Sequence, residues 1–121
     1  MKTDELGKWG EELAVQHLMG QGYAIVQRNW RVDHFETDIV AMKNGRIIFV
    51  EVKTRSDQNS DPLEAIDRKK ILNLVRSANA YVQMYDIPHE IQFDVITVTG
   101  SQAQYRLEHL PDAFTPPLKS Y

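Results

Sequence analysis

The sequence predicts an α/β fold, with a central mixed β-sheet and flanking helices in the order α-β-β-β-α-β-β. Three observations lead to this prediction. Asn44 and Gly45 separate two apolar runs, which is a strong signal for a tight β-hairpin. Apolar residues recur at helical spacing in two stretches, one near the N-terminus and one after Pro62. A β-branched, alternating segment at residues 91–99 indicates a strand after the second helix.

The first half of the chain predicts one helix and three strands. Thr3 or Asp4 is expected to cap a helix that ends near Gly20. Glu11 lies at the edge of the apolar stripe of this helix, where it can approach a site beside the core or pair with a surface cation. Residues 23–31 alternate as in a strand, and residues 39–42 and 47–52 form the two arms of the hairpin.

The second half predicts one helix and two strands. Residues 54–62 form a polar loop, and Asp61 with Pro62 indicates the start of a helix that continues to about residue 84. The strands follow at residues 91–99 and 104–110. Asp94 is the one acidic residue in the first of these strands, and we interpret it as a structural residue that bonds the backbone or an arginine. Phe114 is expected to anchor the C-terminal tail.

Composition limits the class of protein. We expect one domain over residues 1–121, with its core at about residues 3–114 and a loosely packed tail at 115–121. The net charge of −3 argues against a protein that coats nucleic acid non-specifically. The absence of cysteine excludes disulfides and thiolate metal sites, and it is compatible with the cytoplasmic location that we expect. No apolar run reaches about 18 residues, so we expect no membrane partner.

The hairpin brings three charged residues together. Pairing about the turn places Asp38 opposite Glu51, with their Cβ atoms about 5 Å apart. Lys53 follows on the same face of the strand as Glu51, after the apolar Ile47 and Phe49. Two facing carboxylates repel unless a cation or a shared proton intervenes. The pattern therefore fits a Mg²⁺ site, and it fits equally a solvated salt-bridge cluster at the end of a sheet.

The residues around this pair resemble a nuclease signature. Asp38, followed after a hairpin by Glu51-Val52-Lys53, looks like the PD-(D/E)xK signature of restriction-endonuclease-like nucleases. The wider sequence resembles the YraN-like family of small endonucleases through six segments in the family's order. These segments are Gly7-Lys8-Trp9-Gly10-Glu11, Asn29-Trp30-Arg31, Glu36-Thr37-Asp38, Phe49-Val50-Glu51-Val52-Lys53-Thr54-Arg55, Phe93-Asp94-Val95 and Asp112-Ala113-Phe114. The resemblance implies a single-domain restriction-endonuclease-like fold, with a core similar to that of archaeal Holliday junction resolvases.

The resemblance also implies an activity. It is that of a metal-dependent endonuclease that hydrolyses phosphodiester bonds in DNA, either branched or damaged. In that chemistry Asp38 and Glu51 would hold one or two Mg²⁺ or Mn²⁺ ions, which polarise the phosphate and activate a water. Lys53 would orient that water or stabilise the transition state. Glu11 and Glu36 would supply an outer ligand or a base, and Glu36 shares strand parity with Asp38.

Basic residues around this stretch are candidates for contact with DNA phosphates. They are Arg28, Arg31, Arg55, Arg68, Lys69 and Lys70. The last three lie near the start of the second predicted helix, where the helix dipole disfavours cations unless a phosphate is present. A solvated helix face explains them as well. DNA is the expected partner, and a homodimer is left open.

A second function belongs to a different class. A fold does not guarantee its chemistry, so the chain could be a non-catalytic nucleic-acid-binding or scaffolding module on a nuclease-like fold. The acidic pI of about 5.8 favours this alternative. So does Phe35, which stands where the family usually has glycine. The set of Asp38, Glu51 and Lys53 favours catalysis instead, because a scaffold has no use for two opposed carboxylates.

Overall fold

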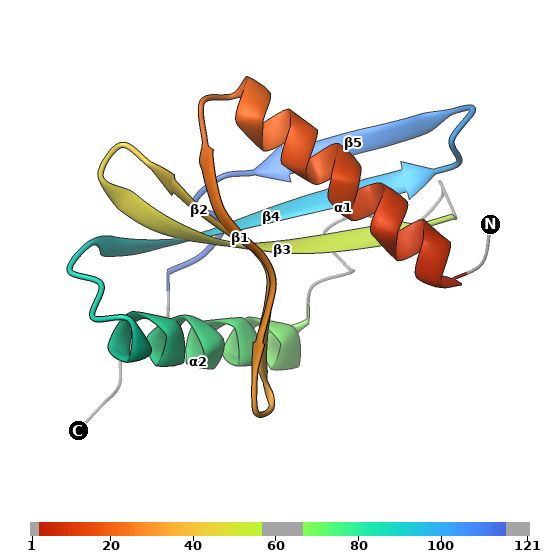
Figure 1. Ribbon diagram of the computed structural model, residues 1–121. Helices are drawn as coiled ribbons and strands as arrows, with labels where there is room; N and C mark the ends of the chain where they lie inside the picture. Colours follow the sequence, from red (N-terminus) through yellow and green to blue (C-terminus); the bar gives the residue numbers. More distant parts are fainter. Residues whose placement is uncertain (1–2, 57–66, 116–121) are drawn as a thin grey trace.

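A five-stranded mixed sheet carries one helix on each face in the computed structural model, which describes residues 3–56 and 67–115 (Figure 1). The elements in chain order are α1 (Thr3–Gly20), β1 (Ala24–Val32), β2 (Phe35–Lys43), β3 (Arg46–Arg55), α2 (Arg68–Met84), β4 (Glu90–Gly100) and β5 (Tyr105–Leu110). The order α-β-β-β-α-β-β confirms the prediction. The architecture is a restriction-endonuclease-like α/β fold, as the motifs implied.

The strands lie in the order β1-β2-β3-β4-β5. All neighbours are antiparallel except β3 and β4, which run parallel and are connected through α2. Asn44 and Gly45 both have positive φ angles, 53° and 75°, as a type I′ hairpin requires. The pairing of Lys43 with Arg46, and of residue 39 with residue 50, confirms the predicted register.

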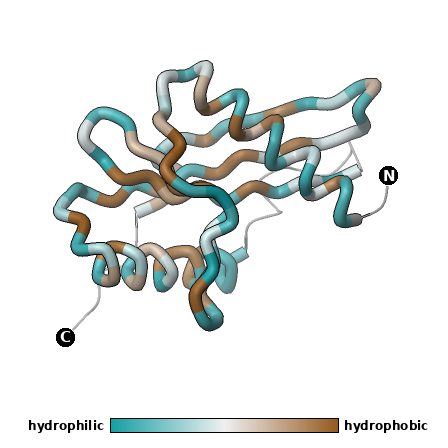
Figure 2. The backbone as a smooth tube through the Cα atoms, viewed as in Figure 1, coloured by the Kyte–Doolittle hydropathy of each residue, from teal (hydrophilic) through white to brown (hydrophobic). Residues whose placement is uncertain are grey.

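The core has two layers because both faces of β3 are covered. On one face Ile48 and Val50 pack with α1, and on the other face Ile47 and Phe49 pack with α2. Hydrophobic residues accordingly follow the strands between the two helices (Figure 2). Trp30 is 2% exposed and belongs to the α2 layer, so the interpretation of this ring as a core residue is confirmed.

Several predicted boundaries shift in the structure. The second helix was predicted from Pro62 without interruption, which is wrong at Asp67. The backbone of Asp67 is extended, with φ −91° and ψ 173°, and its carboxylate accepts the Lys70 N–H to cap a helix that starts at Arg68. The start at Pro62 itself and much of the predicted polar loop lie outside the described residues. The β2 strand is longer than predicted, because the chain reverses at Asp33 and His34.

Two further features of the fold are the anchoring of the C-terminal segment and the hydrophobicity of the helices. Phe114 stacks on Phe93 with ring centroids 5.0 Å apart, which confirms its role as an anchor. Residues 116–121 of the predicted tail lie outside the described residues. Within residues 3–56 and 67–115, no helix is long and apolar enough to cross a membrane.

Candidate functional site

The site lies where α2 begins, on the face of the sheet that α2 covers. Ile47 and Phe49 belong to the core layer under α2, whereas Glu51 and Lys53 follow on the same face of β3. The Lys70 ammonium, from the first turn of α2, lies 3.6 Å from Glu51 Oε1. Along β3, the change from apolar to charged residues thus occurs where α2, which covers the apolar part, has its N-terminal end.

Asp38 enters from β2 at the point where the β2–β3 ladder ends. The last paired residues of that ladder are Ile39 and Val50. Beyond them the Val52 N–H donates to Asp38 Oδ2 at 2.8 Å, so the side chain satisfies a backbone group that the ladder leaves free. Asp38 and Glu51 line one cleft of about 680 Å³. Its other lining residues are Asp4, Leu6, Gly7, Lys8, Glu11, Asn29, Arg31, Glu36, Val52, Lys53, Thr54 and Lys70.

Burial and mutual repulsion raise the pKa values of Asp38 and Glu51 in this cleft. Burial raises the pKa of Asp38 to about 6, although the Val52 N–H partly offsets that effect. Burial, and after it the Asp38 carboxylate, raises the pKa of Glu51 to about 7. The pKa of Lys53 is lowered, chiefly by the neighbouring ammonium of Lys70. Two carboxylates and two ammonium groups therefore interact within the cleft.

Glu11 reaches the cleft from α1 because that helix packs closely on β3. A Cβ atom on Gly10 would overlap the Thr54 side chain, so the absence of a side chain permits this approach. Glu11 Oε1 accepts a hydrogen bond of 2.9 Å from Asn29 Nδ2 and one of 3.4 Å from Arg28 Nε. The structure thus combines the two sequence-based alternatives, since Glu11 borders the cleft and also pairs with a surface cation.

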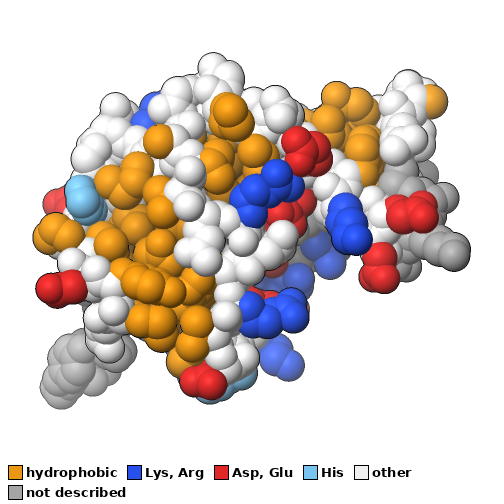
Figure 3. Space-filling model, viewed as in Figure 1, with side chains coloured by type: hydrophobic (Ala, Val, Ile, Leu, Met, Phe, Trp, Pro, Cys, Tyr) orange, Lys and Arg blue, Asp and Glu red, His pale blue; other side chains and the backbone are white. Residues whose placement is uncertain are grey.

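Glu36 also lines the cleft, but its side chain is 67% exposed. It forms an ion pair of 3.0 Å with Arg31, on the neighbouring strand. The Glu36 N–H donates to Ser77 Oγ at 3.1 Å, which fixes this end of the β1–β2 hairpin against α2. Figure 3 shows basic and acidic side chains around a hollow beside a hydrophobic patch.

The basic residues predicted to contact DNA do not form one group. Lys70 lines the cleft described above and also a second, adjoining cleft of about 300 Å³, which Lys69 borders too. Arg31 lines the first cleft. Of the described residues, Arg28, Arg55 and Arg68 line neither cleft. Arg28 is engaged with Glu11 and with Glu12.

Asp38 and Glu51 offer a donor set that suits Mg²⁺ or Mn²⁺. Their carboxylate oxygens are the ligand type that hard cations prefer, and Asp38 Oδ2 is occupied by the Val52 N–H. Among the described residues, no group of three or more His, Cys, Asp or Glu side chains is arranged to hold a metal ion. Mg²⁺ is usually bound through one or two carboxylates together with waters and substrate phosphates. The pair therefore fits such an ion, whereas a preformed cage with Glu11 and Glu36 is absent from the described part of the chain.

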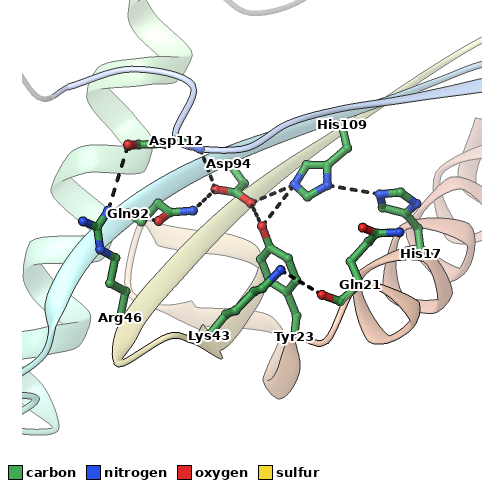
Figure 4. Close-up of polar contacts among 9 residues, drawn as sticks. All are labelled: His17, Gln21, Tyr23, Lys43, Arg46, Gln92, Asp94, His109 and Asp112. Atoms are coloured by element: carbon green, nitrogen blue, oxygen red, sulfur yellow. Dashed lines mark hydrogen bonds and ion pairs between the residues drawn. The ribbon is translucent and has the colours of Figure 1, made fainter.

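A second polar cluster lies away from this cleft, around the fully buried Asp94 (Figure 4). Asp94 Oδ2 accepts hydrogen bonds from Tyr23 Oη at 2.6 Å and from His109 Nε2 at 2.8 Å. Asp94 Oδ1 accepts bonds from Gln92 Nε2 and from the Asp112 N–H. The interpretation of Asp94 as structural and backbone-bonded agrees with these contacts, although histidine and tyrosine take the place of the expected arginine.

His17 joins the same cluster from α1. Its Nε2 lies 3.1 Å from His109 Nδ1, and its pKa is lowered by burial and then by His109. The sequence-based interpretation of His17 as a partly buried helix residue agrees with this position. The cluster connects α1, Tyr23 just before β1, β4 and β5 on the side of the sheet that α1 covers.

The structure gives two residues of the cleft a role that the sequence did not predict: Asn29 had no assigned role, and Lys70 had a different one. Asn29 has a positive φ of 51°, which Asn tolerates better than most residues, and this conformation accompanies its hydrogen bond to Glu11. Lys70 was considered only as a DNA contact, whereas it lies beside Glu51. Asp67 immediately before the basic run was the available signal, since it is a good N-cap and fixes where the helix begins.

Comparison with known proteins agrees with the motifs. A family model described as "Uncharacterised protein family UPF0102" matches residues 10–98. A UPF0102 protein of Bacteroides thetaiotaomicron is 48% identical over 116 residues, which cover 95% of this chain and 96% of the relative. A UPF0102 protein of Flavobacterium psychrophilum is 40% identical over 112 residues, which cover 92% of this chain and 94% of the relative. These matches confirm the resemblance to the YraN-like family, and their descriptions assign no activity.

Proposed function

We propose that this chain, which belongs to the uncharacterised protein family UPF0102, is a Mg²⁺- or Mn²⁺-dependent nuclease. Its proposed reaction is the hydrolysis of phosphodiester bonds in branched or damaged DNA. One observation carries the proposal. Asp38 and Glu51 are two carboxylates in one cleft, with their pKa values raised to about 6 and about 7. Ionising two largely buried carboxylates close together costs folding free energy, so the arrangement favours a site that a cation completes.

The chain's own residues have separate tasks in this reaction. Asp38 and Glu51 would hold the divalent cation, which supplies positive charge at the phosphate and lowers the pKa of a bound water. Lys53 lines the same cleft, where its ammonium would stabilise negative charge that develops on the phosphate in the transition state. Glu11, held by Asn29, accepts a proton from the attacking water or holds that water in place.

The cleft favours DNA through its local charge, despite the net charge of −3. Lys53, Lys70 and Arg31 line it together with the acids. Neutralising Asp38 and Glu51 with a divalent cation leaves the lysines unbalanced, so the cleft becomes attractive to a phosphodiester backbone. The choice of branched or damaged DNA as the substrate rests on the resemblance to Holliday junction resolvases.

Lys53→Gln tests the catalytic proposal. We expect the variant to keep its fold and most of its affinity for a four-way DNA junction, but to lose cleavage about 100-fold or more, the usual scale for one group that acts in the transition state. The assay is cleavage of junction, flap and single-stranded DNA with Mn²⁺. Lys43→Gln is the matched control, because Lys43 lies at the opposite end of β2 and donates to the Gln21 carbonyl. Equal cleavage rates for wild type and Lys53→Gln would reject the assigned role.

A non-catalytic DNA-binding module is the second candidate, and one observation favours it. Both acids already have protein partners, since Asp38 accepts the Val52 N–H and Glu51 pairs with Lys70. A structural cluster of this kind would need no metal. Titration of Mn²⁺ into wild type and Asp38→Ala, followed by NMR, separates the candidates. Binding that requires Asp38 supports the nuclease, whereas DNA binding with no Mn²⁺ uptake supports the module.

A further inference from the structure

Lys70 combines a fixed backbone with a mobile charge. Its N–H donates to the Asp67 carboxylate at 2.9 Å, in the first turn of α2, so its Cα is held at the mouth of the cleft. Its ammonium nitrogen lies 3.6 Å from Glu51 Oε1, and the Lys70 side chain is 39% exposed. A lysine carries its charge on a flexible stem of four carbons, so the ammonium can change partner while the helix stays in place.

The present partner of Lys70 is one of the two expected metal ligands. An ammonium and a divalent cation are both attracted to the same Glu51 carboxylate, and both cannot be its closest cation at once. Bound metal is the stronger competitor, because it carries twice the charge and coordinates the oxygen directly. Binding of the ion therefore releases Lys70 from Glu51 into a cleft that already contains Lys53.

The charge balance of the cleft then changes sign. In the metal-free protein, the ammonium groups of Lys53 and Lys70 offset the carboxylates of Asp38 and Glu51. The described lining of the cleft holds five acids and four bases in all, so a divalent cation changes its formal charge from −1 to +1. The natural partner of a released ammonium in such a cleft is a phosphate oxygen.

We propose that Lys70 is a substrate-binding residue of the catalytic cleft: it occupies Glu51 while the metal is absent, and it contacts the phosphodiester once the metal has bound. This inference rests on the nuclease function proposed above. It makes DNA binding at the cleft dependent on the metal, because the same ion that activates the phosphate also frees the residue that holds it. Lys69, one position earlier, differs in that it is exposed and borders only the adjoining cleft.

Lys70→Met and Lys69→Met form a matched pair for the test, since each removes one positive charge from the same turn of α2 and keeps a helix-forming side chain. The first measurement is Mn²⁺ affinity, from the signal of free Mn²⁺ in electron paramagnetic resonance. We expect Lys70→Met to bind Mn²⁺ about two- to fivefold more tightly than wild type, because a competitor for Glu51 is gone. Lys69→Met should change the affinity by a smaller factor.

The second measurement is affinity for a four-way DNA junction, with Ca²⁺ as a non-cleaving ion and separately with EDTA. We expect Lys70→Met to weaken binding several-fold with Ca²⁺ and little with EDTA, where Lys70 is held by Glu51. Lys69→Met should have the same effect in both conditions.

The outcomes separate this inference from the function on which it rests. Wild type that takes up no Mn²⁺ overturns both. Wild type that binds Mn²⁺ and cleaves DNA, with Lys70→Met no different from Lys69→Met in Mn²⁺ and junction affinity, overturns the role of Lys70 and leaves the nuclease intact. Weaker Mn²⁺ binding by Lys70→Met also overturns it, because the lysine would then support the metal site.

Discussion

Replacing Glu51 with Gln should stabilise the metal-free protein at alkaline pH. The pKa of Glu51 is raised from 4.5 to about 7, by burial and then by Asp38, so ionised Glu51 destabilises the folded state. Since one pKa unit corresponds to about 1.4 kcal/mol, this difference amounts to about 3 kcal/mol at most. The attraction to Lys70 needs no separate correction, because it already offsets part of the rise in the pKa of Glu51. The expected gain in the free energy of unfolding is therefore up to about 3 kcal/mol.

The pH dependence gives this prediction its sign. A carboxyl group whose folded-state pKa is raised destabilises the protein fully above that pKa, and the effect disappears below the ordinary pKa of 4.5. Urea denaturation with EDTA should therefore show the gain of Glu51→Gln at about pH 8, and nearly none at about pH 4.5. Glu12→Gln is the control, because Glu12 is exposed, pairs with Arg28 and has a lowered pKa. It should give no gain.

A wild type as stable as Glu51→Gln at about pH 8, or more stable, would refute the reasoning. Glu51 would then be well solvated or fully compensated by Lys70, and the electrostatic argument for a metal at this position would lose its basis. Addition of Mn²⁺ at about pH 8 provides an internal check. It should stabilise wild type and narrow its difference from the variant, since an ion that binds only the folded state shifts the unfolding equilibrium.

Two further predictions concern the parts of the fold that support the cleft. Gly10→Ala should lower the free energy of unfolding by about 1–3 kcal/mol and slow DNA cleavage, because the new methyl group overlaps Thr54 and displaces α1 together with Glu11. Chemical denaturation should show that the double variant with Thr54→Ala recovers part of this stability. A Gly10→Ala variant as stable as wild type would contradict the close packing. Asp94→Asn should cost about 2–4 kcal/mol near neutral pH, since it removes the charge that accepts four hydrogen bonds. The difference in stability between wild type and Asp94→Asn should narrow as the pH falls below 3.8. The four hydrogen bonds hold the pKa of Asp94 below that ordinary value, and at lower pH the wild type loses the charge too. A difference that stays constant down to acid pH would show that the shape of the side chain and not its charge is responsible.

The fold could be predicted because its signals are local. The positive φ angles of Asn44 and Gly45 fix a two-residue turn, and the turn fixes the pairing from Lys43–Arg46 to Ile39–Val50. Alternation along β3 then determines which side chains share a face. Asp38 and Glu51 are 13 positions apart, yet the turn brings them to one cleft, so their meeting was predictable without any knowledge of the other elements.

The start of α2 was predicted less well, because two local signals compete. Pro62 and Asp67 are both typical of helix starts, and the extended backbone at Asp67 shows that the described helix begins after it. The difference matters for function, since a helix that starts at Arg68 places Lys70 in its first turn. Helical periodicity indicated an apolar face of α2, to which the buried Leu74 and Ala78 belong, but it missed the buried Tyr81 and carried no information on this boundary.

The sequence by itself therefore determined the order of elements, the hairpin register from Lys43–Arg46 to Ile39–Val50, and the presence of Asp38 and Glu51 in one cleft, because each depends on residues close together in the chain. Tertiary structure decided where the side chains of the two helices lie relative to that pair. Lys70 arrives from α2 and Glu11 from α1, through packing on the two faces of one sheet. Such contacts depend on helix position to within a few ångströms, which is set by details such as Gly10 against Thr54 and not by any periodic pattern.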